Sequence, residues 1–484
     1  ELKQNQLFKK LFRYSPFFCF LTKKDNMSKL KNVKGGKIVD KDRMGSQKVL
    51  TLLIELSIPA MIGMIVNAIY NIVDRMFIGN APDLGSLGLA GITVSYPVTL
   101  ILMALSLMAG VGGATRFSIA LGAKEEEDAK YYQGNALMIT VIFGIVFMVL
   151  GNIFMDPILT ILGASEKVLP YASDYLSIIL YGGVFQCVAM CGNNFSRAQG
   201  NAKNAMVSQL LGAGFNIVFD YILIVQFHMG MEGAALATIG GQCLSMIWQL
   251  SFLFGKRGII PCRLSHMKLK KHYTYMIMKT GLPAFLMQLS TSVLNIVING
   301  TLGLYGGDLA ISTVGIITSV QTLMLMPLTG MTQGQQPIIS YNYGAKNYHR
   351  VKETLKYTII GSSILSCLGF LVIQLFPSMI ISIFNQEPAI IELGNSALRI
   401  WFICLPLVGC QTMCANFFQA IGMVKQSSFL NLLRQCLLLI PLILILSWIF
   451  GLYGVFIAVP IADFIAFIIT MYLIQKRLKT FVVA

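Results

Sequence analysis

Asp74 and Pro59 stand out in the first long apolar segment, Leu50–Gly79, because a plain membrane-spanning helix would carry neither. A charged carboxylate in the hydrocarbon region costs about 2.5–3.5 kcal/mol on insertion scales, and carboxylates retained at that cost usually mark an ion or substrate path. A proline removes a backbone hydrogen bond and bends its helix. We therefore expect Asp74 to bind an ion or a substrate, and Pro59 to act as a hinge in the same helix.

The composition indicates a membrane protein. Of 484 residues, 55% are hydrophobic and 12% are charged, which is more apolar surface than a soluble core could bury. Charge-poor runs of about 20 residues, long enough to span a bilayer, recur along the chain, whereas the short alternating strands of a membrane β-barrel do not. We predict an all-α polytopic membrane protein with twelve transmembrane helices, near residues 50–79, 91–116, 131–153, 170–191, 195–226, 232–254, 274–303, 309–341, 352–376, 390–414, 417–449 and 454–475.

The basic residues beyond the first 48 predict the orientation of these helices. Twenty of them fall on one side of the twelve-helix count, and among the loops of the other side only Lys167 is basic. Since basic loops stay in the cytoplasm, both termini are predicted to be cytoplasmic, in a multi-pass protein of the plasma membrane. The twenty are Arg116, Lys124, Lys130, Arg197, Lys203, seven residues between Lys256 and Lys279, Lys346, Arg350, Lys352, Lys356, Lys425, Lys476, Arg477 and Lys479.

The N-terminal tail is strongly basic. Residues 1–48 hold 13 basic and 4 acidic side chains, or +9 of the formal charge of +16. We expect a disordered cytoplasmic tail attracted to anionic lipid headgroups, and no binding of nucleic acid. Met27 is a candidate start, so residues 1–26 are expected to be either upstream read-through or part of the disordered tail.

An internal repeat divides the chain into two halves. A shift of 224 places Pro59 on Pro283, and a shift of 222 places Gly122-Ala123-Lys124 on Gly344-Ala345-Lys346. Because each half holds six helices, an even number, the halves have the same orientation, as in parallel-repeat transporters. The predicted parts are a tail at 1–48, an N-lobe at 49–254, a basic cytoplasmic linker at 255–272 and a C-lobe at 273–484.

Several phrases make the chain resemble one transporter family. They are LSIPAMIGMIVNAIYNIVDRMFIGN (56–80), ALGAK (120–124), NNFSRAQGNAKNAM (193–206) and NIVFDYILIVQFHMGMEGAALAT (216–238). From about residue 44 onward the chain resembles the multidrug and toxic compound extrusion (MATE) family. The resemblance implies a V-shaped pair of six-helix lobes. It also implies export of small organic, often cationic or amphiphilic, compounds in exchange for Na⁺ or H⁺. We expect a monomer among membrane lipids, with no cofactor beyond the coupling ion.

The same resemblance assigns the cation-coupling site to Asp74, Asn216, Asp220 and Thr238, which would also be the Na⁺ ligands if Na⁺ is the ion. The positions agree with this independently. Asp74 and Asp220 lie five and six residues before the outer ends of their helices, and Thr238 lies six residues after the outer end of a helix that runs the other way. All three therefore sit about 8–9 Å below the outer boundary, and Asn216 is one turn deeper. Their hard oxygen ligands suit a small cation, and two adjacent carboxylates can also hold a proton.

The repeat provides an internal control for this site. Asp74, Asp220 and Thr238 correspond to Ile298, Leu442 and Val459 in the second half, which has kept the helices but lost the polar groups. A purely architectural role would be expected in both halves. Asp463, on the last helix, has no counterpart in the first half, and it could serve either coupling or helix packing.

Residues of a substrate cavity are less sharply indicated. Tyr70, one turn before Asp74, is a candidate aromatic wall for an organic cation. Gln288 and Gln321, with Met287, are candidates on the first two helices of the second lobe, because flexible methionine surfaces adapt to varied ligands. Ordinary apolar packing is the alternative for each methionine.

Two other functions fit the sequence less well. A lipid-linked sugar flippase of the wider superfamily would need a basic groove for pyrophosphate, and the only arginines placed within the membrane are Arg75, Arg399 and Arg434, all near helix ends. A membrane enzyme is not expected either. The ten cysteines are scattered, the four histidines fall in loops or at helix ends, and neither a Walker A sequence nor a nucleophile elbow occurs.

Overall fold

The computed structural model describes residues 42–81, 84–255 and 257–481. These residues fold into helices, and no strand occurs among them. The proposed read-through segment, residues 1–26, lies outside the described residues, as does most of the predicted tail. The last residues of that tail form the short helix α4 (Arg43–Ser46).

The N-lobe consists of long helices and one short one. They are α5 (Val49–Asn80), α6 (Gly85–Gly122), α7 (Glu126–Ile153), α8 (Met155–Ile161), α9 (Leu169–Tyr181), α10 (Gly183–Ala198), α11 (Ala202–Asp220), its π-helical continuation η2 (Tyr221–Gln226), and α12 (Gly230–Leu253). α9 and α10 are apolar enough to form one span together, bent by 52°. α5 stays helical through Pro59.

The C-lobe repeats this order after the linker turn η3 (Leu264–Met267). Its helices are α13 (Lys271–Gly344), α14 (Tyr348–Leu375), α15 (Pro377–Phe384), α16 (Pro388–Trp401), α17 (Leu405–Ala420), α18 (Val424–Leu432), the π-helix η4 (Leu433–Leu439), α19 (Ile440–Phe450) and α20 (Leu452–Thr480). α13 contains two spans that meet at Gly307, whose φ of 59° and ψ of −156° are accessible to glycine only. α16 and α17 form a second bent pair, at 48°.

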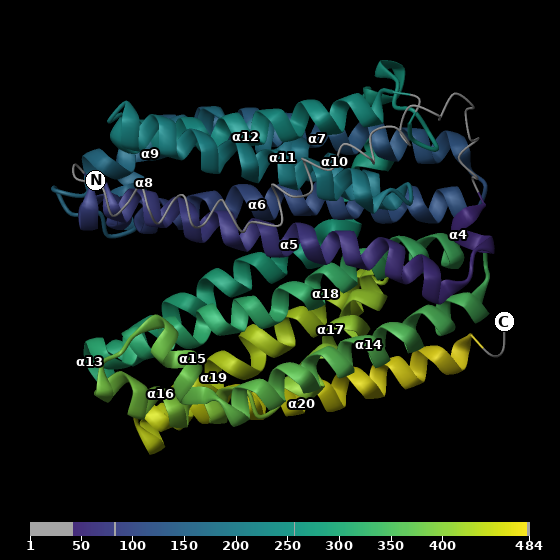
Figure 1. Cartoon of the computed structure of the whole chain (residues 1–484). Helices are drawn as coiled ribbons and strands as arrows, with labels where there is room; N and C mark the ends of the chain where they lie inside the picture. The colour runs from purple at the N-terminus through teal and green to yellow at the C-terminus, as the bar shows by residue number, and fades with distance from the viewer. Residues whose placement is uncertain (1–41, 82–83, 256, 482–484) are drawn as a thin grey trace, which may run out of the picture. The chain divides into compact units, whose positions relative to one another are not determined.

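The number and type of spans agree with the sequence analysis. Ten helices of the described residues are long and apolar enough to cross a membrane, and the two bent pairs raise the number to twelve. The prediction of an all-α polytopic membrane protein is therefore confirmed. Figure 1 shows the purple to teal helices of the N-lobe and the green to yellow helices of the C-lobe as two bundles.

One detail of the helix boundaries was wrong. The predicted spans near 170–191 and 195–226 place their break at residues 192–194, but α10 continues through the buried Arg197 to Ala198 and α11 begins at Ala202. The polar run before Arg197 pairs inside the protein: Gln249 Nε2 donates to Asn193 Oδ1 at 2.7 Å, and Ser196 Oγ donates to Gln249 Oε1 at 2.6 Å. Since satisfied polar groups can be buried at little cost, this polar run does not mark a loop.

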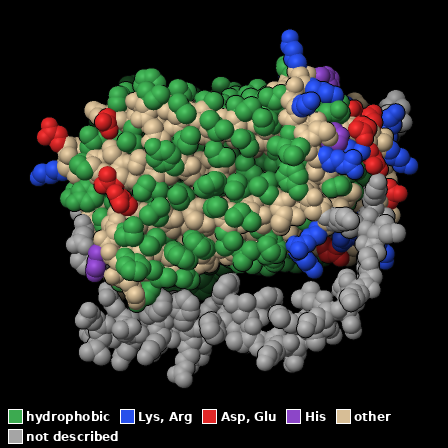
Figure 2. All heavy atoms as spheres, turned by 90° about the horizontal axis from the view of Figure 1, so that it is seen from above, with side chains coloured by type: hydrophobic (Ala, Val, Ile, Leu, Met, Phe, Trp, Pro, Cys, Tyr) green, Lys and Arg blue, Asp and Glu red, His purple; other side chains and the backbone are tan. Residues whose placement is uncertain are grey.

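Charged side chains concentrate at the ends of the bundles. We call the end that holds Lys124, the linker, Lys346 and Arg477 the basic end, and the end that holds α8 and α15 the opposite end. Figure 2 shows hydrophobic side chains covering the middle of one face, with most of its Lys and Arg side chains at one end. An apolar band between charged ends is the surface expected of a protein surrounded by lipid.

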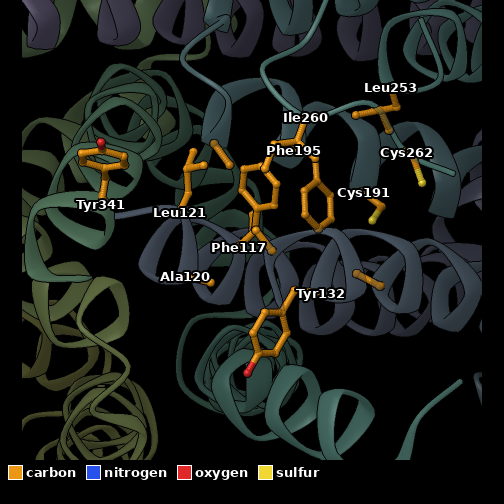
Figure 3. Packing of buried hydrophobic residues seen from close by; sticks show 14 of the residues in the cluster. Phe117, Ala120, Leu121, Tyr132, Cys191, Phe195, Leu253, Ile260, Cys262 and Tyr341 are labelled. Atoms are coloured by element: carbon orange, nitrogen blue, oxygen red, sulfur yellow. The ribbon is translucent and has the colours of Figure 1, made fainter. Parts of the chain in front are cut away.

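The two lobes are packed tightly toward the basic end. A Cβ on Gly281 of α13 would lie 1.7 Å from the Met108 carbonyl oxygen of α6, and one on Gly122 of α6 would lie 1.9 Å from the Tyr341 carbonyl oxygen of α13. Only glycine permits these backbone approaches. Figure 3 shows Tyr341 on the same side of the cluster as Leu121, with Phe117 and Phe195 at its centre.

Toward the opposite end the same helices expose apolar side chains. On α5, Ile72 is 53% exposed; on α13, Ile296 is 72% exposed and Leu304 is 84% exposed. The lobes are therefore in close backbone contact toward the basic end, and α5 and α13 carry exposed apolar side chains further along.

Candidate functional site

Two buried carboxylates meet in the N-lobe. Asp74 of α5 is 8% exposed and Asp220, the last residue of α11, is fully buried. Their carboxyl groups lie within hydrogen-bonding reach of one another. Two carboxylates at this distance and depth do not both remain charged without a cation or a proton between them, because their repulsion is poorly screened there.

Asn216 joins this pair to α12. Its Nδ2 donates to Asp220 Oδ1 at 3.4 Å and to Thr238 Oγ1 at 3.3 Å. The four residues that the sequence analysis assigned to cation coupling are thus brought together from α5, α11 and α12. Their gathering is a property of the structure, whereas their role in coupling stays a prediction.

Three oxygen atoms of this group lack a hydrogen-bond partner within the described part of the chain. They are Asp74 Oδ1, Asp220 Oδ2 and Asn216 Oδ1, and all three are buried. A buried polar atom without a partner costs about 1–3 kcal/mol, so three in one place point to a missing ligand. Oxygen donors of this kind suit Na⁺, or a proton on one carboxyl.

The site does not have the composition of a transition-metal centre. No group of three or more His, Cys, Asp or Glu side chains with metal-binding geometry occurs among the described residues. The oxygen donors present are two carboxylates, an amide and a hydroxyl, from Asp74, Asp220, Asn216 and Thr238.

The helix that carries Asp220 changes its winding at this residue. η2 begins at Tyr221, and its Phe227 amide donates to the carbonyl oxygen of Ile222. Such π-helical turns are rare and often accompany functional sites. The C-lobe has its own π-helix, η4, so the irregular winding belongs to both halves while the carboxylates belong to one.

Tyr175 is a member of the site that sequence reasoning missed. Its side chain is buried on α9, and its hydroxyl makes a hydrogen bond with Thr238. It also lies close enough to Asp74 and Asp220 to interact electrostatically with both. Nothing in the sequence near Tyr175 indicates this, because the contact depends on how α9 packs against α12.

Tyr70 and Arg75 flank Asp74 on its own helix. Tyr70 is partly buried, hydrogen-bonds with Asn71 and interacts electrostatically with Asp74, in accord with a place beside the ion site. Arg75 is exposed, and its guanidinium carbon lies 6.0 Å from the centre of the Tyr96 ring. Its charge lies close enough to Asp74 to interact with it electrostatically.

The predicted substrate residues of the C-lobe lie on α13, the helix that packs against α5 through Gly330 and Gly334. Met287 is 43% exposed, and Gln288 and Gln321 are partly buried. Their role in substrate binding stays a prediction.

The two repeated six-helix bundles, with an acid pair buried in one of them, define a membrane transporter of the helical, internally repeated class. The MatE family model matches residues 59–222 and 283–445, one match in each lobe, and the chain belongs to this family, the MATE transporters. The prediction of the family is confirmed. The homologues are transporters and not enzymes.

Curated relatives and solved structures agree with this assignment. The chain is 29% identical to the multidrug export protein MepA of Staphylococcus haemolyticus over 428 residues, which cover 88% of this chain and 94% of that protein. An outward-facing MATE family multidrug resistance transporter matches with a TM-score of 0.87 and 26% identity, over 93% of this chain and 100% of the other. The MATE multidrug transporter DinF-BH, solved as a complex, matches with a TM-score of 0.84 and 36% identity, over 89% and 96% of the two chains.

Proposed function

We propose that this protein exports small organic compounds across the membrane in exchange for Na⁺ or H⁺. The relatives named as multidrug exporters and multidrug transporters support the substrate class. The three unpartnered buried oxygens of Asp74, Asp220 and Asn216 carry the proposal of ion coupling. An ion that binds there would lie beside side chains that already contact one another, because Asn216 donates a hydrogen bond to Thr238.

The coupling follows from the arrangement of helices. Asp74 lies on α5, the helix that also packs against the C-lobe on both sides of Pro59. An ion drawn between Asp74 and Asp220 pulls α5 toward α11, and a bend at Pro59 would pass this movement to the contact between the lobes. A ligand shifts a conformational equilibrium only by its differential affinity, so ion and substrate must favour different states.

We further propose that the basic end faces the cytoplasm, since basic loops remain on that side. The exposed apolar side chains toward the opposite end of α5 and α13 would then lie in the outer half of the membrane. One chain holds both lobes and the entire acid pair, so we propose a monomer with lipid around its apolar band.

Transport in proteoliposomes tests the function. The purified chain is reconstituted in vesicles loaded with a fluorescent organic cation, and either a Na⁺ gradient at fixed pH or a pH gradient without Na⁺ is imposed. We expect one gradient to drive net transport and the other to do so weakly or not at all. If dye transport does not depend on either gradient, exchange is contradicted, and the protein would act as a facilitator.

Binding measurements add a second test. Raising the coupling ion should weaken binding of the transported cation to purified protein, and Asp74→Asn should remove this antagonism. If substrate affinity in the wild type depends on neither Na⁺ nor pH, the proposal that ion and substrate are exchanged in one transport cycle is contradicted.

A further inference from the structure

Arg197 is a buried cation that the proposed exchange cycle does not use. Its side chain is 6% exposed and lies near the end of α10, with the length of α11 between it and Asp220. Its Nη2 donates to Asn194 Oδ1 at 3.2 Å, within its own helix, while its buried Nη1 has no hydrogen-bond partner among the residues that the structure describes. Burying a guanidinium group without a counter-charge is costly, and one unsatisfied donor adds to that cost.

Arg197 lines a small pocket at the junction of the lobes. The pocket has room for about one water-sized group. Its lining residues are Ala114, Ser118, Asn194, Arg197 and Ala198 from the N-lobe, and Gln333, Gln336 and Pro337 from the C-lobe. The pocket is therefore complete only when the lobes are together at this level.

Three polar atoms of the pocket lack a hydrogen-bond partner within the described part of the chain. These atoms are Ser118 Oγ, Gln333 Oε1 and Arg197 Nη1, and all three are buried. The Gln333 Nε2 atom has only the Met64 sulfur at 3.5 Å, a weak acceptor. Rotating this amide by 180° would exchange its O and N atoms and turn a donor toward the pocket at little cost.

The charges around the pocket select the kind of ligand. Among the described residues, one arginine and no Asp or Glu lines it. The negative end of the α10 helix dipole offsets part of the arginine charge, but a dipole end amounts to about half a charge. A guanidinium N–H, a hydroxyl and an amide N–H are donors that can hold a small anion.

We propose that this pocket binds one small monovalent anion such as chloride, and that the bound anion stabilises the state in which the lobes are closed at the basic end. The second part follows from the lining, since separation of Gln333 from Arg197 removes one wall of the pocket. At a concentration of ten times its Kd, a ligand that binds only the closed state raises the ratio of closed to open molecules about tenfold. This site is separate from the coupling ion and does not depend on its identity.

Bromide locates the site directly. Crystals of the full chain grown in bromide should show anomalous density within hydrogen-bonding distance of Arg197 and Ser118. This peak should be absent in Arg197→Gln and present in Arg116→Gln. Arg116 is a matched control, because its Nε donates to Thr280 Oγ1 at the same junction but it does not line the pocket. Water at Arg197 in crystals that carry bromide elsewhere would overturn the proposal.

Distances between the lobes test the conformational part. Spin labels on unnatural amino acids at Ile161 of α8 and Ile383 of α15, which are 84% and 73% exposed, report the separation of the opposite ends. Replacing gluconate by chloride at constant ionic strength should enrich the longer distance about tenfold in the wild type and in Arg116→Gln, and have no effect in Arg197→Gln. If the distance distribution of the wild type is the same in chloride and in gluconate, the conformational part of the proposal is overturned.

Should Arg197→Gln fail to fold, Ser118→Ala serves the same purpose. It removes one donor from the pocket while keeping the arginine. Both the bromide occupancy and the chloride-dependent shift should then fall severalfold. Unchanged occupancy together with an unchanged shift would contradict the assignment of the pocket.

Discussion

Ser57 of α5 and Gly334 of α13 touch so closely that a Cβ on Gly334 would stand 2.3 Å from the Ser57 hydroxyl oxygen. One turn further along, a Cβ on Gly330 would lie 2.6 Å from the Met61 Cα. Pro59 lies between these two contacts on α5. The predicted hinge therefore sits where the N-lobe helix that carries Asp74 presses against the C-lobe.

Replacing Pro59 by Ala should slow transport and leave ion binding intact. Alanine restores a backbone hydrogen bond and favours a straight α5, which raises the barrier to bending. A barrier higher by about 1 kcal/mol lowers turnover about fivefold. Turnover in proteoliposomes and equilibrium binding of the ion would be measured in parallel. Pro97→Ala, in the interior of α6, is the matched control. An unchanged turnover would show that the bend does not limit the cycle.

Replacing Asp220 by Asn should reduce gradient-driven efflux to the rate of empty vesicles. The amide keeps the shape of the side chain but neither carries a charge nor releases a proton. The protein should remain folded, because removal of one of two adjacent carboxylates also removes their repulsion. Asp174→Asn, which changes an exposed carboxylate on α9, should transport like the wild type. Efflux at the wild-type rate in Asp220→Asn would remove this residue from the mechanism.

The sequence revealed Asp74 and Asp220 because an acid inside an apolar run is visible without any knowledge of packing. Their common depth also followed from the helix rise alone. Tyr175 and Arg197 could not be found in this way. The role of Tyr175 depends on which face of α9 meets α12, and Arg197 follows a polar run whose partners, such as Gln249, come from another helix. Local pattern shows what is unusual in a segment, whereas pairing between segments is set by tertiary structure.

Tyr175→Phe should weaken binding of the coupling ion without preventing it. The change removes the hydrogen bond to Thr238 and leaves this hydroxyl free to turn away from Asn216. One hydrogen bond contributes about 0.5–1.5 kcal/mol, which corresponds to about a two- to tenfold loss of affinity. Ion titrations of purified protein would measure it. Tyr181→Phe, on an exposed position at the end of α9, should bind the ion like the wild type. An equal loss in both variants would indicate a general effect on α9.

Asp463 pairs with another residue in the structure. This pairing bears on whether Asp463 serves ion coupling or helix packing. Arg434 Nε donates to Asp463 Oδ1 at 2.7 Å, between η4 and α20, and the Asp463 side chain is largely buried. Asp463→Asn should destabilise the protein by about 3 kcal/mol, the lower end of the range for breaking a buried pair, because Arg434 then loses its counter-charge. Thermal unfolding in detergent would measure the loss.

The double variant Arg434→Met/Asp463→Asn separates packing from coupling. With both charges removed, most of the stability should return. If the pair only joins helices, efflux should return with it. Recovery of stability without recovery of efflux would assign the pair a part in transport.

Arg350 of α14 holds the chain segment that enters the N-lobe. Its Nη2 donates to the carbonyl oxygens of Met44 at 3.2 Å and Gln47 at 2.6 Å, and Asn342 Nδ2 donates to the same Met44 carbonyl at 3.0 Å. Met44 is 1% exposed. A segment that leads directly into α5 is thus fastened to the C-lobe at the basic end.

Arg350→Gln should favour separation of the lobes at the basic end. It removes charge-assisted bonds that exist only while the lobes are together, and a loss of about 1.4 kcal/mol changes the ratio of the two states about tenfold. Spin labels at Ile161 and Ile383 should then report a larger population of the shorter distance at the opposite end. Lys425→Gln removes an exposed charge from the same end and should leave the distances unchanged. Equal distance distributions in the wild type and Arg350→Gln would mean that these bonds hold the segment before α5 in place but do not shift the equilibrium between the two conformations.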